Sequence, residues 1–401
     1  MEHAPLPRGW QRHELGELVS FASGGTPSKE KADYWNGDIP WVTAKDMKTF
    51  ELTTSELKIT TDGLRHGGRT VPANSLLVLV RGMTLMKDVP ICLTTREMAF
   101  NQDVRGLQVK GKVDPRFLAY ALVAQKEQLR GLVNIAGHGT GRLSTEALAE
   151  HPIIVPASRC EQEAIAAVLS AWDRAIAQTA SLTVAQERLK QGLAQQVFAG
   201  KRRMRRFCDT WRRCELGHVF NDRREPGYDG LPVLSVTLDA GVVRRNSRDK
   251  AVRTSLEHDE HLLVRKGDIA YNMMRMWQGA SGIATEDGVV SPAYVVCEPT
   301  DAIHSRFADH LFHTPRMIFL FWAYSYGLTD DRRRLYFDGF SRIPVELPSV
   351  TEQRRIADVI DRLDEELRLL RQKCDLLKLQ KRGLMQQLLS GRQRVKNAVF
   401  K

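Results

Sequence analysis

The stretch EQEAIAAVLSAWDRAIAQ, residues 161–178, decides the architecture of this chain because it occurs twice. It returns as EQRRIADVIDRLDEELRL at residues 352–369, and the match continues from KQGLAQQVFAGKRR to KRGLMQQLLSGRQR at the same offset of 191 residues. An internal repeat constrains architecture more firmly than local propensity does. We therefore expect two copies of one structural unit.

Both copies have the apolar spacing of a long helix that buries a seam. Alternate steps of four and three residues from Ile356 meet an almost unbroken apolar series, whereas the same steps from Ile165 are apolar at both ends and polar over 179–190. Lys190 and Lys381 occupy the same seam position. A helix over 161–199 would be about 58 Å long, which exceeds the width of most globules of this size.

These lengths predict that the two helices pack on each other. Antiparallel pairing would relate the two units by a pseudo-two-fold axis and bring the chain ends together; the alternative is an ordinary amphipathic helix packed on its own globule. The predicted pairing residues are Ile165, Leu169, Trp172, Ile176, Leu193, Val197, Ile356, Ile360, Leu363, Leu367, Leu370, Leu377, Leu384 and Leu388.

The segments upstream of the helices also repeat, but more faintly. WQRHELGEL (10–18) is matched by WRRCELGHV (211–219), and a proline-bracketed apolar segment, HPIIVP (151–156) or IPVELP (343–348), precedes each helix and predicts a strand. The predicted fold class is α+β, with two α/β globules separated by two long helices paired as an antiparallel coiled coil. We expect globules at 1–150 and 205–342, and helical spacers at 151–204 and 343–401.

Composition favours a polyanionic partner. The chain has 401 residues, of which 59 are basic and 48 acidic, so its net charge is +11. No apolar run approaches the roughly 18 residues of a membrane span, and the start of the chain has no basic and apolar signal pattern, so we expect a cytoplasmic protein without a membrane partner. Six cysteines without a CxxC pair predict reduced thiols rather than structural zinc or disulfides.

Catalytic motifs are weak in this sequence. GLQVKGKV (106–113) misses a phosphate-binding P-loop because Val113 has no hydroxyl for Mg²⁺ and because the following VDP favours a loop over the helix that would hold the phosphate. We expect a hairpin turn here. AGHGTGR (136–142) favours a surface loop over a dinucleotide site. No nucleophile elbow, HExxH helix or kinase signature is present. We therefore expect no catalytic residue, metal or cofactor in this chain.

The remaining polar loops carry groups that bond to base edges and phosphates. Any one of these residues could be merely solvated, but their presence in both halves favours DNA binding. The basic stretch 201–213 fits a solvated linker and a phosphate contact equally well. The candidate DNA-binding residues are Thr26, Lys45, Arg81, Gln102, Arg105, Arg142, Asn272, Arg275, Arg332, Arg333, Arg334 and Tyr336.

The repeat and the paired EQ…IA helix openings, together with SGGTPSKEKADYWNGDIPWVT (23–43) and GDIAYNMMRMWQGASGIATEDGVVSPAY (267–294), resemble the specificity subunits of type I restriction-modification systems. The resemblance implies two target-recognition domains, each reading half of an asymmetric, gapped sequence in double-stranded DNA, and a helical pair that sets the gap. It also implies a non-catalytic scaffold for two modification subunits, which bind S-adenosylmethionine and methylate adenine, and for restriction subunits that use ATP and Mg.

The sequence leaves two other classes of protein open. One is a stand-alone nuclease or methylase with a cryptic active site. The other is a coiled-coil interaction protein with no role on DNA.

Overall fold

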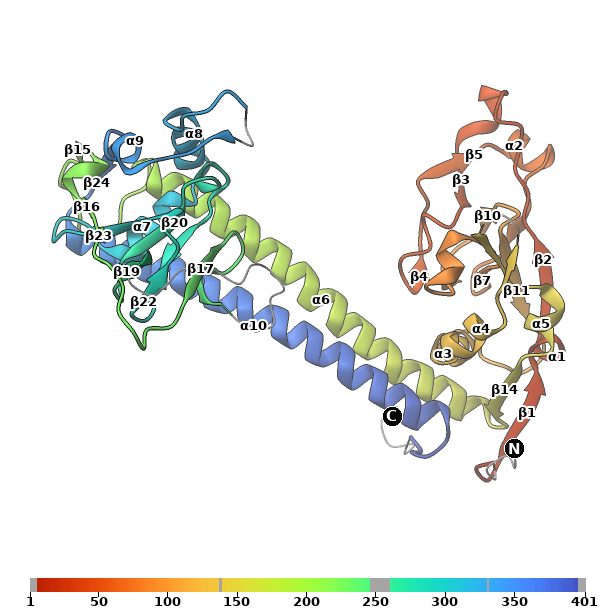
Figure 1. The fold of residues 1–401 in the computed structure, drawn as a ribbon. Coiled ribbons are helices and arrows are strands. Elements are labelled where there is room, and N and C mark those ends of the chain that lie inside the picture. The colour runs from red at the N-terminus through yellow and green to blue at the C-terminus, as the bar shows by residue number, and fades with distance from the viewer. Residues whose placement is uncertain (1–5, 137–138, 246–259, 330–331, 396–401) are drawn as a thin grey trace. The chain divides into compact units, whose positions relative to one another are not determined.

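The computed structural model describes residues 6–136, 139–245, 260–329 and 332–395 (Figure 1). The chain divides into two compact units: unit 1 comprises Met1–Thr179 and Lys373–Lys401, and unit 2 comprises Ala180–Gln372. Two helices of 40 residues, α6 (Arg159–Phe198) and α10 (Val350–Leu389), each contribute to both units. The predicted long helices are therefore present, and each begins two residues before its repeated EQ pair.

The first and last strands of the globule of unit 1 pair with each other. β1 (Trp10–Glu14) pairs antiparallel with β14 (Pro152–Pro156). Two larger sheets follow, with strand orders β2-β11-β7-β9-β4 and β5-β3-β10-β6. The strands are β2 (Val19–Ser23), β3 (Trp35–Val42), β4 (Glu51–Leu52), β5 (Leu57–Ile59), β6 (Thr70–Val71), β7 (Leu76–Leu79), β9 (Ile91–Thr94), β10 (Met98–Phe100) and β11 (Val104–Val109).

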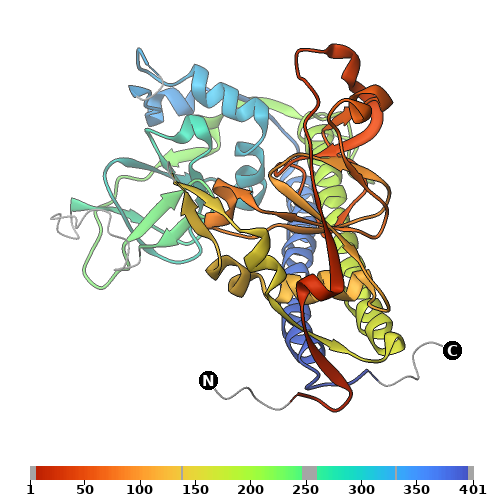
Figure 2. The same cartoon turned by 90° about the vertical axis from the view of Figure 1, so that its right-hand side faces the viewer.

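Short helices and a third sheet complete the globule of unit 1 (Figure 2). The third sheet has the order β12-β13-β8. These elements are β8 (Arg81–Gly82), β12 (Asn134–Ala136), β13 (Thr140–Arg142), α1 (Leu15–Leu18), α2 (Thr61–Arg65), α3 (Pro115–Ala124), α4 (Lys126–Gly131), α5 (Thr145–Ala149), and the 3₁₀ helices η1 (Ala32–Tyr34) and η2 (Met83–Met86).

Unit 2 repeats this plan with different strands. β15 (Arg212–Glu215) pairs antiparallel with β24 (Pro344–Leu347), and the main sheet has the order β16-β23-β20-β21. The remaining elements are β16 (Phe220–Asp222), β17 (Leu234–Thr237), β18 (Gly241–Arg244), β19 (Leu262–Val264), β20 (Ile269–Asn272), β21 (Ser281–Ile283), β22 (Gly288–Val290), β23 (Tyr294–Pro299), η4 (Leu216–His218), η6 (Met276–Gln278), α7 (Ser305–Phe312), α8 (Pro315–Ala323) and α9 (Phe337–Ser341).

The repeated EQ pair anchors each long helix to its globule. The buried Gln162 side chain donates to the Pro156 carbonyl at 2.8 Å and accepts from the Asp114 backbone amide at 2.7 Å. Gln353 makes the equivalent bonds to the Pro348 carbonyl at 3.0 Å and from the His304 amide at 2.8 Å. Because glutamine satisfies one donor and one acceptor at once, both copies need this residue.

The glutamates of the two pairs bind arginines that follow the opposite long helix. Glu161 pairs with Arg394, and Glu352 accepts from Arg203 at 2.8 and 3.0 Å. Each long helix ends at a glycine with positive φ, Gly200 or Gly391, which is the common helix C-terminal cap.

Within unit 1, the described residues near the two ends of the chain contact each other, as predicted. A Cβ atom on Gly391 would lie 3.2 Å from the Trp10 ring, and the Arg394 guanidinium donates to the Arg8 carbonyl at 3.0 Å.

The ends of the long helices belong to the globule cores. In unit 1, Ile165 and Leu169 of α6 share a buried cluster with Leu388 of α10 and the globule. In unit 2, Val197 of α6 and Ile356 of α10 do the same. The globule and both helices therefore form one packed body within each unit.

Two local predictions were wrong. Residues 106–113 do not form a β-hairpin: β11 ends at Val109, a turn at 111–112 follows, and the chain then enters α3, whose N-cap Asp114 accepts from the Phe117 amide at 2.8 Å and whose first residue is Pro115. Asp-Pro is a favourable helix start, so VDP indicated a helix rather than a loop. Residues 134–136 and 140–142 pair as the antiparallel strands β12 and β13 rather than lying in a plain surface loop, and residues 137–138 lie outside the described residues.

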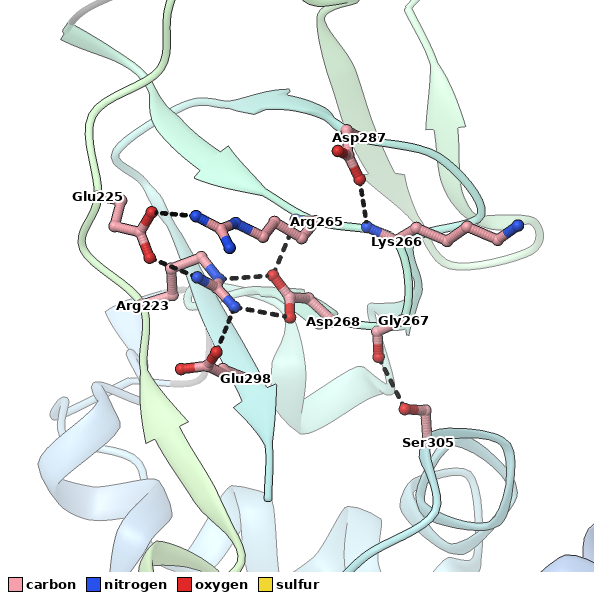
Figure 3. Close-up of polar contacts among 9 residues, drawn as sticks. All are labelled: Arg223, Glu225, Arg265, Lys266, Gly267, Asp268, Asp287, Glu298 and Ser305. Carbon is pink, nitrogen blue, oxygen red and sulfur yellow. Dashed lines mark hydrogen bonds and ion pairs between the residues drawn. The ribbon is translucent and has the colours of Figure 1, made fainter. Parts of the chain in front are cut away.

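A buried ionic cluster supports the main sheet of unit 2 (Figure 3). Arg223, after β16, donates to Asp268 at 2.8 Å and to Glu298 at 2.6 Å and also pairs with Glu225. Asp268 also accepts from the Arg265 amide at 2.8 Å. The cluster fixes the tight turn that enters β20, where Gly267 has a φ of +97° and its carbonyl accepts from Ser305.

Helix α7 turns a carboxyl group toward α10. The Oδ1 atom of Asp309 is buried and has no hydrogen-bond partner, while His313 lies 4.0 Å away. Burial raises the pKa of Asp309; the nearby His313 and His310 lower it, and Asp361 and Asp364 raise it. The ionised form is thus penalised in the folded chain.

We expect Asp309→Asn to stabilise unit 2 at pH 7 by about 1 kcal/mol, the scale of one unsatisfied buried polar group. A raised folded-state pKa contributes stability that is present below the unfolded-state pKa and lost as pH rises. The gain should therefore be small near pH 4 and full at pH 7 in urea unfolding. Asp301→Asn, at an exposed turn, is the control. An equal gain at both pH values would assign the effect to packing.

All six cysteines are free thiols, as predicted. Burial raises the pKa of Cys92 to about 12, which keeps this thiol protonated. Among the described residues, no helix combines the length and the apolar character that crossing a bilayer requires.

Candidate nucleic-acid interface

Three of the predicted loops of unit 1 meet at one edge of its sheets. The Gly25 amide donates to the Phe100 carbonyl at 2.9 Å, and the Asn101 amide donates to the Val42 carbonyl at 3.0 Å. The loops after β2, β3 and β10 are thereby held side by side. Thr26 donates to the Gln102 side chain at 2.6 Å. Lys45 lies exposed on the turn after β3.

The three predicted arginines of unit 1 gather at the neighbouring β8–β13 pair. Arg81 and Arg142 stand directly opposite each other in the antiparallel register. Arg105 donates from Nε to the Thr145 hydroxyl at 3.1 Å. None of the three forms an ion pair in the described part of the chain. Like charges directly opposed across strands are destabilising, so this arrangement favours an anionic ligand.

The predicted residues of unit 2 lie around the end of β20. The Asn272 side chain accepts from the Met274 amide at 3.0 Å, which shapes the turn that exposes Arg275. Arg334 bridges to Tyr326 through backbone bonds of 2.8 and 2.9 Å. Tyr336 is the exposed N-cap residue of α9.

Arg332 and Arg333 directly precede Arg334, within the segment that this bridge closes. Arg332 is exposed, and the guanidinium of Arg333 lies 4.2 Å from the centre of the Trp322 ring and donates to the Trp322 carbonyl at 3.2 Å. The residues between Leu328 and Arg332 include 330–331, which lie outside the described residues.

The candidate interfaces of the two units share one backbone arrangement, which was not predicted from the sequence. The Leu143 amide donates to the Val80 carbonyl at 2.9 Å after β7, and the Leu335 amide donates to the Met273 carbonyl at 2.9 Å after β20. An arginine, Arg142 or Arg334, precedes each leucine. The signal was present as the Arg-Leu pairs at 142–143 and 334–335, which are 192 residues apart, but two matching residues are too few to detect alone.

Exposed aromatic side chains distinguish unit 2 from unit 1. Phe319 and Trp322 of α8 stack with ring centres 5.9 Å apart, and both are exposed, as is Tyr326. The corresponding helix of unit 1, α4, exposes Glu127 and Arg130 instead. Exposed aromatic rings beside arginines are typical of binding surfaces. The two units therefore present different chemistry on one framework.

All fourteen predicted pairing residues of α6 and α10 are buried or half-buried. Within unit 1, Asp173 pairs with Lys381. Within unit 2, Glu187 pairs with Arg371, whereas Arg203, farther along the chain, pairs with Glu352. Residues farther along the first segment therefore contact residues nearer the start of α10. The two helices run antiparallel in each unit (Figures 1 and 2).

The basic stretch 201–213 has at least one structural residue. Arg203 binds Glu352 and lies 5.7 Å from the centre of the Trp211 ring. Its neighbours Arg205 and Arg206 line a surface pocket with Arg354 and Arg355. Among the described residues, no group of three or more His, Cys, Asp or Glu side chains is arranged to hold a metal ion.

The geometry defines a duplicated, helix-linked protein with a cationic loop cluster in each globule. Residues 7–185 match the model of the type I restriction modification DNA specificity domain. The chain is 29% identical over 161 residues to the type I restriction enzyme EcoR124I/EcoR124II specificity subunit of Escherichia coli, an alignment that covers 40% of each protein. It is 31% identical over 173 residues to the MjaIX specificity subunit of Methanocaldococcus jannaschii, covering 42% of this chain and 39% of that protein. The alignments thus span about two fifths of these relatives.

Solved structures match over nearly the full chain. The S subunit of a type I restriction-modification system from M. genitalium has a TM-score of 0.58 at 16% identity and covers 97% of both chains. A chain from a structure describing complex assembly and conformational transition of the type I R-M system has a TM-score of 0.59 at 14% identity, covering 98% of this chain and 100% of that one. Residues 7–185 are therefore similar to the type I DNA specificity domain, and the whole chain shares the fold of the solved S subunits. These comparisons agree with the resemblance noted in the sequence.

Proposed function

We propose that this chain reads DNA sequence for a type I restriction-modification complex, with one recognition domain in each unit. The opposed Arg81 and Arg142 carry this proposal: neither forms an ion pair in the described part of the chain, although Arg142 lies close enough to Glu146 to help lower the pKa of that carboxyl group. A guanidinium can donate two bonds to the edge of guanine or to a phosphate, so an arginine pair on a strand edge suits a DNA groove.

Recognition would proceed in two steps. Lysine and arginine side chains first displace counterions and hold the duplex without regard to sequence. The loop clusters of the two units then each test a short stretch of bases. Because the helices hold the second cluster near the DNA once the first is bound, the second contact forms at high effective concentration. Two weak contacts with short stretches of bases thereby give one sequence-specific interaction.

We further propose that two modification subunits and the restriction subunits assemble on this chain and perform the chemistry. S-adenosylmethionine, ATP and Mg would bind to those partners rather than to this chain. The family match and the pairing of α6 with α10 in both units support a scaffold role, since a duplicated chain offers two similar surfaces to two copies of a partner.

We expect Arg275→Ala to relax discrimination at one half of the target only, by about 1–3 kcal/mol at the base that it contacts. Arg142→Ala should relax the other half. The complex with modification subunits would be titrated with duplexes carrying single substitutions in either half. Arg224→Ala, at a highly exposed residue of unit 2, is the control.

Other outcomes would redirect the proposal. If Arg275→Ala weakens binding to all duplexes equally, Arg275 contacts phosphate rather than a base. Modification of DNA by the isolated chain with metal and cofactor would establish a stand-alone nuclease or methylase. No affinity for duplex DNA even with modification subunits present would leave an interaction protein.

A further inference from the structure

Two lysines occupy the seam between α6 and α10, and each has an aspartate partner on the other helix. In unit 1, Lys381 of α10 donates to Asp173 of α6 at 2.6 and 2.7 Å. In unit 2, Lys190 of α6 pairs with Asp364 of α10. Both lysines and both aspartates are related by the 191-residue offset of the repeat. One polar contact therefore occurs twice, with the roles of the helices exchanged.

The pair in unit 1 is well enclosed. The Lys381 side chain is 14% exposed, and its ammonium lies 5.0 Å from the centre of the Tyr120 ring and 5.9 Å from that of Phe50. The Tyr120 hydroxyl donates to Asp173 at 2.7 Å. Because Tyr120 belongs to α3 of the globule, this contact joins both long helices to the recognition domain.

The Lys190–Asp364 pair in unit 2 is more exposed to solvent, but a neighbouring ion pair joins the same two helices. The Lys190 side chain is 27% exposed and that of Asp364 is 43% exposed. Arg371 donates to Glu187 at 2.6 Å on the neighbouring turn, so a second ion pair joins the same two helices. Polar residues at seam positions lower the stability of a coiled coil but specify its register.

The residue numbers show which residues face Lys190 and Lys381 when α6 and α10 slip along each other by one heptad. The two pairs have the same sum of residue numbers, 554. If the helices slipped by one heptad in either direction, Lys381 would face Ala166 or Ala180, and Lys190 would face Ala357 or Arg371. None of these directly facing residues is acidic, so each slip removes the aspartate that faces each ammonium group in the observed register.

The apolar residues of α10 give much weaker discrimination. Leu363, Leu370, Leu377 and Leu384 repeat every seven residues along α10, so a shift of one heptad replaces one leucine with another. A uniform leucine seam is known to leave register and oligomer state under-specified.

We propose that the Asp173–Lys381 and Asp364–Lys190 pairs are specificity-determining residues outside the recognition loops: they select the register of α6 and α10, and the register sets the length of the gap between the two half-sites. This inference rests on the proposed function. A slip of one heptad displaces one helix by about 10.5 Å, which corresponds to about three base-pair steps of 3.4 Å.

The test uses the full chain assembled with modification subunits, and duplexes in which two fixed half-sites are separated by a random-length gap. Methylated duplexes are sequenced. We expect the unaltered chain to select one gap and the double variant K190M/K381M to select a second gap as well, about three base pairs longer or shorter, in at least a tenth of reads. Methionine keeps the length of the lysine stem and removes its charge.

Charge exchange provides the second measurement. Lys381→Asp alone places two carboxylates together and should lower methylation at the original gap at least tenfold, while D173K/K381D should restore the single gap. The same holds for K190D against D364K/K190D. Arg368→Met is the matched control, because among the described residues Arg368 pairs only within its own helix, with Glu365 and Gln372.

The outcomes separate the two proposals. A single, unchanged gap in folded K190M/K381M, or no recovery in either exchanged pair, would overturn the register proposal and assign register to the globule cores. If the unaltered chain selects no gap at all, the proposed function fails instead.

Discussion

Insertion of one heptad into both long helices is expected to lengthen the selected gap by about three base pairs and to abolish modification of the original target. The insertions belong between Thr183 and Val184 of α6 and between Leu370 and Arg371 of α10, at matching levels of the seam. Seven residues return the seam to the same face of each helix, so the pairing and both loop clusters are kept. Only the distance between the two recognition domains changes.

The same duplexes with variable gaps measure this result. Both half-sites should remain unchanged in sequence, because the recognition loops are untouched. Insertion in α6 alone is the control and should reduce modification at every gap, since one helix then bulges out of the pair. An unchanged gap after the double insertion would show that the helices do not act as the spacer.

Replacement of Arg223 by leucine is expected to destabilise unit 2 by about 3–5 kcal/mol, the cost of breaking a buried ion pair. Arg223 and Asp268 are both 4% exposed, so the substitution leaves the Asp268 carboxylate buried without its main counter-charge. Burial raises the pKa of Asp268, and Arg223 is the strongest influence that opposes the rise. The loss also frees the turn into β20, which carries Asn272 and Arg275.

Chemical unfolding of the chain measures the loss. Arg224→Leu, at a neighbouring side chain that is 79% exposed, should change stability by less than about 0.5 kcal/mol. The double variant R223L/D268L should recover only part of the loss, since it removes the unpaired Asp268 carboxylate but still deprives Glu298 and the Arg265 amide of their partners. Equal losses for Arg223→Leu and Arg224→Leu would contradict the role of the buried cluster.

The long helices could be predicted from the sequence because their seam has a strong period. The structure starts α6 and α10 two residues before the predicted position, and the Ser-x-x-Glu patterns at 158–161 and 349–352, which are typical of a helix N-cap, are the signal that was missed. Lys190 and Lys381 were visible at one seam position, but their partners Asp173 and Asp364 were not, because these aspartates lie beside the seam rather than within it.

The candidate site could be predicted only as a set of residue types. Thr26 and Gln102 lie 76 residues apart in the chain, and only strand pairing brings them within hydrogen-bond distance. Arg81 faces Arg142 through a two-residue strand, β8, that is too short to have a hydrophobic period. The start of α3 was missed for a different reason: Asp114 and Pro115 were interpreted as a loop although they form a favourable cap.

The strand pairs β1–β14 and β15–β24 have a consequence for how new target preferences arise. In each pair the entry and exit strands of a globule run next to each other, so the chain enters and leaves the globule at one place. The segment between the two strands can be exchanged as a cassette wherever the incoming globule keeps the core contacts with α6 and α10. On the proposed function, recombination at these strand pairs would give a lineage a different recognised half-sequence in one event, while the glutamine anchors and the helices stay as they are.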